Sequence, residues 1–161
     1  MIIIIGCNKD GLAKTTTTTN IAVGLALKGN EVVLVDADPQ RSASRWYSER
    51  EQACLDPKIT LIEKRDNISQ TLKSLNDKYD HIIVDVSGRN SRELITGCTV
   101  VDQIIAPHQC SQLDLDTLIE LQQQLEAIRD LNPELKAYCY QSMATTNQFY
   151  KTMNVMSFWS L

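Results

Sequence analysis

A lysine followed directly by threonines, at the point where an apolar run gives way to a helical pattern, is well suited to phosphate chemistry. The apolar residues 2–5 lead into a loop that ends in Lys14 and Thr15, and a helical pattern over residues 16–28 is closed by Gly29. A phosphate-binding loop needs inward-turned backbone N–H groups, a helix N-terminus, a lysine near the β- and γ-phosphates and a hydroxyl for Mg²⁺. Lys14 and Thr15 fit the last two roles.

Aspartates end two further apolar runs. Asp36 and Asp38 stand at the end of residues 31–36, before Pro39, and Asp85 ends a later run. Carboxylates at the C-terminal ends of parallel strands point into the crevice where such folds bind ligands. An ordinary acidic turn stopped by Pro39 is the alternative for the first pair. The order and spacing of all three aspartates relative to the loop favour the ligand site.

These side chains need a sheet to position them, and the sequence predicts one. Short apolar runs alternate with helical patterns, which is typical of an α/β fold with a mostly parallel central sheet and helices on both faces. Several runs lack alternation, as strands buried on both faces do. We expect one three-layer domain over residues 1–161. The predicted strands are residues 1–6, 31–36, 58–63, 81–86, 101–107 and 136–143.

Helix starts and buried helix faces are also predicted. Asn67 with Gln70, and Asn90 with Glu93, have the spacing of capping boxes. Two apolar stripes at helical spacing indicate core faces, and the second ends before Pro133. The stripes are Ile68, Leu72, Leu75 and Tyr79, and then Leu118, Leu121, Leu125 and Ile128.

Composition excludes several classes of protein. A chain of 161 residues, 43% hydrophobic and 22% charged, has the composition of one soluble domain, and no apolar run approaches a bilayer span or a signal peptide. We therefore expect a cytoplasmic protein without a membrane partner. The five single cysteines and the lone His81 and His108 fit neither a disulfide framework nor a zinc site. A net charge of −4 argues against a broad basic surface but allows a local nucleic-acid patch.

The loop resembles the deviant Walker A motif of ParA/MinD-type P-loop ATPases, Lys-Gly-Gly-x-Gly-Lys-Thr-Thr, and is most similar to that of small plasmid-partition ParA proteins. Lys9 matches the additional lysine, which in that family reaches across a dimer interface to the other subunit's nucleotide; a solvated loop lysine is the alternative. The resemblance implies P-loop NTPase topology and an ATP-sandwich homodimer. It assigns nucleotide binding to Lys9, Asp10, Gly11, Leu12, Ala13, Lys14, Thr15, Thr16 and Gly88.

The resemblance also implies individual roles. It assigns catalysis to Lys9, Lys14 and Asp38, and Mg²⁺ binding to Thr15, Asp36 and Asp85. Asp38 would orient the attacking water, Asp36 would support the Mg²⁺ shell, and Asp85 would act as a Walker B aspartate that holds Mg²⁺ through water. Gly88 would place its amide near the γ-phosphate.

Two loop residues depart from the family pattern, because Asp10 and Ala13 replace glycines. A carboxylate at Asp10 would lie near the terminal phosphate and the dimer interface, where like charges repel. If the position of Ala13 requires positive φ, alanine costs on the order of 1 kcal/mol. We therefore expect weakened nucleotide binding and slow hydrolysis.

Three functions follow from the resemblance, which extends to about residue 147 and leaves a divergent tail over residues 148–161. The first is a partition ATPase that binds ATP or ADP with Mg²⁺, dimerises, responds to a ParB-like centromere-binding adaptor and segregates plasmid DNA. Family members usually continue further, so we expect a C-terminally shortened sheet and weakened nonspecific DNA binding. The second is a binding module without productive ATP chemistry. The third is a MinD-like membrane-positioning protein, for which the apolar tail would have to form an amphipathic helix.

Overall fold

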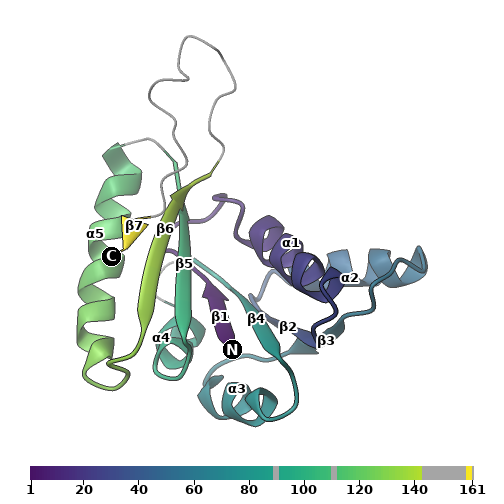
Figure 1. The fold of residues 1–161 in the computed structure, drawn as a ribbon. Helices are drawn as coiled ribbons and strands as arrows, with labels where there is room; N and C mark the ends of the chain where they lie inside the picture. The colour runs from purple at the N-terminus through teal and green to yellow at the C-terminus, as the bar shows by residue number, and fades with distance from the viewer. Residues whose placement is uncertain (89–90, 110–111, 143–158, 161) are drawn as a thin grey trace.

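Seven strands form a single sheet in the computed structural model, which describes residues 1–88, 91–109, 112–142 and 159–160 (Figure 1). They are β1 (Ile2–Ile5), β2 (Val32–Ala37), β3 (Thr60–Glu63), β4 (His81–Val86), β5 (Gln103–His108), β6 (Lys136–Gln141) and β7 (Trp159–Ser160). The strand order is β3-β2-β4-β1-β5-β6-β7. Every neighbouring pair is parallel except β6 with β7. The predicted parallel sheet is confirmed.

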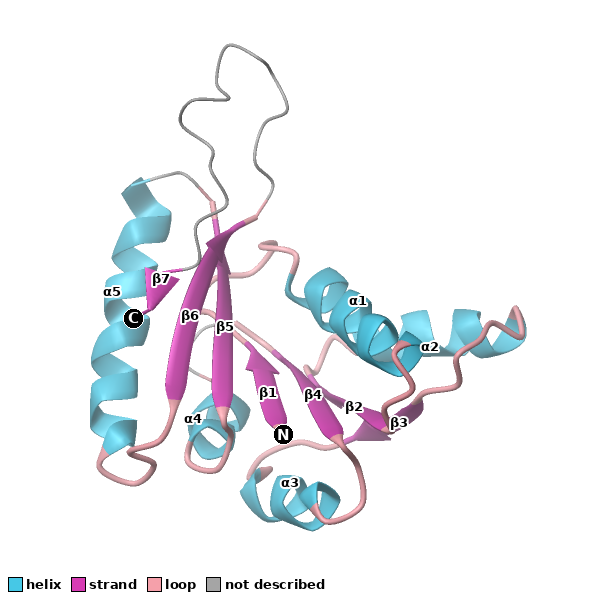
Figure 2. Ribbon diagram, viewed as in Figure 1, coloured by secondary structure: helices cyan, strands magenta, loops and turns pink. Residues whose placement is uncertain are grey.

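In the described parts of the chain, five helices cover the two faces of this sheet (Figure 2). They are α1 (Lys14–Leu27), α2 (Ser42–Gln52), α3 (Ser69–Asn76), α4 (Arg92–Cys98) and α5 (Gln112–Arg129). One apolar core includes residues of α1, α2 and the strand side chains facing them, and the other joins α3, α4 and α5 to the opposite face. Successive side chains of β1 therefore enter different cores, which explains why its sequence is apolar throughout.

The predicted strands all form: β4 has the predicted bounds, and the bounds of the others differ by one or two residues. β3 begins at Thr60 rather than at residue 58, and β5 begins at Gln103 rather than at residue 101. β6 is described as far as Gln141, while residue 143 lies outside the described residues. The antiparallel β7 was not predicted, because only two residues of the tail form it.

The second apolar stripe identifies the long helix correctly. Leu118, Leu121, Leu125 and Ile128 are all buried in the core beneath α5. Helix α2 was not predicted. Ala43 and Ser44 are its only buried residues. A helix that buries so few side chains leaves no apolar period for a sequence pattern to reveal.

Both capping predictions need correction. Asn67 Oδ1 accepts hydrogen bonds from the backbone N–H and the hydroxyl of Ser69, and α3 begins at Ser69, one residue later than predicted. Asn90 lies outside the described residues, and α4 is capped by Ser91, whose Oγ accepts from the Leu94 N–H at 3.1 Å. Glu93 accepts instead from the Asp66 N–H at 2.8 Å, so this carboxylate joins α4 to the segment after β3.

The topology brings the loop between β1 and α1 to the carboxyl edge of the sheet, beside the ends of β2 and β4 (Figure 1). The ends of β2 and β4 hold Asp36 and Asp85, which are register partners. No helix among the described residues combines the length and apolarity needed to cross a bilayer.

Candidate phosphate-binding site

The loop that joins β1 to α1 has two residues with positive φ before the helix starts. Gly11 has φ of 77° and Ala13 has φ of 63°, so the position before Lys14 adopts positive φ. Ala13 is the N-cap of α1, yet no side chain caps this terminus and no acidic residue lies in the first turn. The N–H groups and the dipole at the start of α1 are therefore left for an anion.

Lys14 places its ammonium group inside this loop. Its side chain is only 7% exposed, and Nζ donates to the Lys9 carbonyl oxygen at 2.7 Å. Nζ also lies 3.4 Å from Asp10 Oδ1, and the same oxygen accepts from the Gly88 N–H at 3.3 Å. The structure thus brings Lys9, Asp10, Lys14 and Gly88 together at one point.

Thr15 joins the first turn of α1 to strand β4. Its hydroxyl donates to Asp85 Oδ2 at 2.7 Å, and Thr18 donates to Asp85 Oδ1 at 3.3 Å. Burial is the main cause that raises the pKa of Asp85 from 3.8 to about 6; the nearby carboxylates of Asp36 and Asp38 raise it further, and the two threonine hydrogen bonds oppose the rise. A divalent cation here would remove that repulsion.

The oxygen atoms at this site fit Mg²⁺ better than they fit a metal ion whose ligands all come from the protein. Thr15 and Asp85 supply hard oxygen atoms in contact with each other. Within the described parts of the chain, no group of three or more histidine, cysteine, aspartate and glutamate residues could hold a metal ion. Few protein ligands are what Mg²⁺ needs when waters and phosphate oxygens complete its shell.

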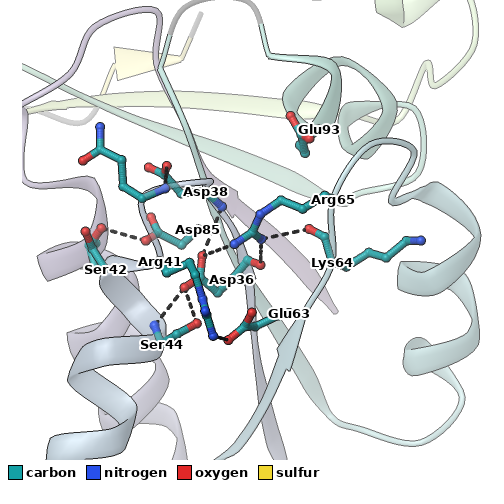
Figure 3. A network of polar contacts seen from close by, with 12 residues as sticks. Asp36, Asp38, Arg41, Ser42, Ser44, Glu63, Lys64, Arg65, Asp85 and Glu93 are labelled. Carbon is teal, nitrogen blue, oxygen red and sulfur yellow. Dashed lines mark hydrogen bonds and ion pairs between the residues drawn. The ribbon is translucent and has the colours of Figure 1, made fainter.

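Asp36 uses its buried carboxylate to organise the turn that follows β2 (Figure 3). Oδ2 accepts from the backbone N–H and the hydroxyl of Ser44 at 2.8 and 2.5 Å, and Oδ1 accepts from the Asp38 N–H at 3.1 Å. Arg65 completes this arrangement, because its guanidinium donates to the Asp36 carbonyl and lies 3.8 Å from Oδ1. The contacts in the structure therefore make Asp36 a positioning residue for Asp38.

Asp38 lies on the wall of a small cleft. Its Oδ1 accepts from the Gln40 N–H at 2.8 Å, and only 7% of the residue is exposed. The cleft has a volume of about 190 Å³. It is lined by Asp10, Gly11, Ala13, Lys14, Thr15, Thr16, Asp38, Gln40 and Ser42. Leu12, by contrast, buries its side chain in the core.

Sequence reasoning missed three residues that hold the site together: Thr18, Ser44 and Arg65. Thr18 had a usable signal, since a helix that begins at Lys14 puts residues 14 and 18 on one face. Ser44 and Arg65 had none, because each meets Asp36 only through the packing of α2 and of the segment after β3. The contacts of Ser44 and Arg65 with Asp36 form only when the chain folds, so the sequence pattern does not reveal them.

Two relatives of this chain are named for carboxysome distribution and for chromosome partitioning. Maintenance of carboxysome distribution protein A from Gloeobacter kilaueensis is 38% identical over 113 residues, covering 70% of this chain and 50% of the relative. Chromosome partitioning protein ParA from Myxococcus xanthus is 26% identical over 174 residues, covering 84% of this chain and 62% of the relative. The chain thus spans between half and two thirds of the length of these relatives.

Solved structures share the fold. A plasmid partition protein from Borrelia burgdorferi superposes with a TM-score of 0.74 at 22% identity, covering 94% of this chain and 82% of that one. Cobyrinic acid a,c-diamide synthase from Mycobacterium smegmatis, crystallised with an ATP analogue and magnesium, gives 0.79 at 19% identity, covering 94% and 78%. The family described as ATPase MipZ matches residues 1–137. The chain therefore belongs to the ATPase MipZ family, among the ParA-type P-loop ATPases.

Proposed function

We propose that this chain binds a Mg²⁺-nucleotide in the cleft between α1 and the ends of β2 and β4. The observation that supports this most directly is the contact between Thr15 and Asp85 at 2.7 Å, beside the buried Lys14. A cation-binding hydroxyl, a carboxylate and a lysine meet there at an uncapped helix N-terminus. This is the set of groups that a nucleoside polyphosphate with Mg²⁺ requires.

Each residue then has a role in the proposed site. Lys14 neutralises phosphate charge, Thr15 binds Mg²⁺ and Asp85 holds it through water. Asp38 orients the attacking water, and Asp36 fixes the Asp38 turn and so supports the Mg²⁺ shell indirectly. Mg²⁺, when bound, would supply charge neutralisation at the phosphate oxygens.

The cellular role that we propose is partition of DNA or of another large cargo by a ParA-like mechanism. The relatives named for chromosome partitioning and for carboxysome distribution support this class of process. Their names indicate two kinds of cargo, chromosomes and carboxysomes. In this proposal the protein pairs as a nucleotide-sandwich homodimer through Lys9 and responds to a ParB-like adaptor. Contact with nonspecific DNA belongs to the same proposal.

A second candidate function is a nucleotide-responsive binding module with little hydrolysis. The specific observation that favours it is the contact of Asp10 with Lys14, which places a carboxylate on the cation expected to serve the phosphates. Phosphate release from Mg²⁺-ATP separates the two candidates. Turnover abolished by Lys14→Ala supports the ATPase, whereas nucleotide binding without turnover supports the binding module.

Calorimetric titration with Mg²⁺-ADP and Mg²⁺-AMPPNP tests the nucleotide site itself. We expect the protein to bind at least one of them and Lys14→Ala to weaken that binding by about tenfold or more, because a charge-assisted phosphate contact is lost. Lys73→Ala, on the exposed side of α3, is the matched control and should bind as the wild type does. Wild-type affinity in Lys14→Ala, or a folded wild type that binds neither nucleotide, would refute the proposal.

A further inference from the structure

Two hydrogen-bond donors at the phosphate-binding loop point to the same carboxylate, which belongs to the chain itself. Lys14 Nζ lies 3.4 Å from Asp10 Oδ1, and the Gly88 N–H donates to the same oxygen at 3.3 Å. The donors come from different segments, since Lys14 begins α1 and Gly88 follows β4. An ammonium group and an amide aimed at one oxygen atom form an anion position, and Asp10 occupies it.

The fit around this position is close. A Cβ atom added to Gly88 would lie 2.6 Å from Asp10 Oδ1 and 3.0 Å from the Lys9 carbonyl carbon. A residue larger than glycine at position 88 would therefore displace the carboxylate of Asp10 and press on the backbone of Lys9. The contact is a built feature of the loop, because the side chain of Asp10 and the backbone of two segments share the space.

Asp10 remains able to leave. Its side chain is 51% exposed, whereas that of Lys14 is 7% exposed. A phosphate oxygen bound by Lys14 at this point would have to displace the carboxylate or lie against it, with two negative charges in contact. The rest of the site does not involve Asp10 in this way: Thr15 bonds to Asp85, and the N-terminus of α1 has no side-chain cap.

We propose, on the basis of the nucleotide site proposed above, that Asp10 is a specificity residue that occupies the position of a terminal phosphate. The site then accepts a nucleoside diphosphate in preference to a triphosphate. The diphosphate uses the helix N-terminus, Lys14 and the Mg²⁺ ligands while Asp10 stays in place. The triphosphate must expel Asp10 from Lys14 and Gly88 before it binds.

The test is the ratio of dissociation constants for Mg²⁺-AMPPNP and Mg²⁺-ADP, measured by calorimetry in four proteins. We expect the ratio to exceed about ten in the wild type and to fall by about tenfold or more in Asp10→Gly, because a like-charge contact of this size is removed. Asp10→Asn keeps the shape and removes the charge, so it should lower the ratio in the same direction. Asp77→Asn, an exposed carboxylate after α3, should leave the ratio at the wild-type value.

The outcomes distinguish the specificity proposal from the proposal of a nucleotide site on which it rests. If the nucleotides bind but neither Asp10 variant lowers the ratio, Asp10 does not set specificity, and the proposed nucleotide site stands. If the wild type binds both with equal affinity, Asp10 likewise has no such role. If the folded wild type binds neither nucleotide, the nucleotide site is refuted and the specificity proposal falls with it.

Discussion

Ala13 pays a conformational cost for its place in the loop. Its φ of 63° is in the left-handed region, where an alanine Cβ lies too close to the following carbonyl and glycine meets no such clash. We expect Ala13→Gly to raise the free energy of unfolding by about 1 kcal/mol, after allowing for the greater freedom of glycine in the unfolded chain. Urea unfolding followed by circular dichroism measures this change.

Ala26 provides the matched control for that substitution. It lies in the last turn of α1 with ordinary helical geometry, where Ala26→Gly should instead destabilise the protein by about 1 kcal/mol. Opposite signs at the two positions would identify backbone conformation as the cause. A loss of stability in Ala13→Gly similar to that in Ala26→Gly would show that the left-handed turn is not strained.

Elements with a strong local pattern could be predicted from sequence, and those that depend on tertiary contacts could not. β1 is apolar throughout and β4 is apolar from Ile82 to Val84 because both faces of these strands are buried, and the stripe of α5 is regular. Helix α2 lacks such a stripe. Its start is fixed by Ser44 bonding to Asp36, a contact that joins two elements and leaves no period in the sequence.

Asp85 couples α1 to β4 and makes stability depend on pH. Its pKa is raised to about 6 in the folded protein, mainly by burial, above an ordinary value of 3.8. A raised carboxyl pKa means that the folded state binds the proton more tightly, so the protein is favoured below about pH 4 and loses this stability as the pH rises through 6.

Asp85→Asn should remove this dependence, because the amide stays neutral. In EDTA, we expect the free energy of unfolding of Asp85→Asn, minus that of the wild type, to grow by about 2 kcal/mol between pH 4 and pH 7. Urea unfolding of both proteins in matched buffers measures the difference, and titrating groups that do not interact with Asp85 cancel in the comparison. A difference that is the same at both ends of the range would contradict the assignment.

The order of the strands in the sheet brings the candidate site residues together. Local sequence patterns did not predict this order. β1 lies between β4 and β5, so the loop after β1 and the first turn of α1 meet Asp85 and Gly88, which are 70 or more residues away in the sequence. The sequence predicted the aspartates and the loop, and it assigned them to one crevice by the rule for parallel sheets. It could not place Asp10 on Lys14, because that contact depends on the conformation of the loop.

Association of two copies is a property of the whole molecule. Lys9 is half-buried in the loop, and its carbonyl accepts from Lys14, which holds this part of the backbone at the cleft. If Lys9 serves the nucleotide of a second copy, dimer formation should require both a bound triphosphate and this lysine. Asp10→Gly is the suitable background, because it removes the carboxylate that opposes a triphosphate.

In that background we expect light scattering to detect a dimer with saturating Mg²⁺-AMPPNP and a monomer without nucleotide. Adding Lys9→Ala should leave the protein monomeric while calorimetry still detects nucleotide binding, since Lys14, Thr15 and Asp85 remain in the same chain. Lys28→Ala, at the exposed far end of α1, should dimerise as the background does. Equal dimerisation with and without Lys9 would remove it from the interface, and a monomer at saturation in the Asp10→Gly background would refute the sandwich arrangement itself.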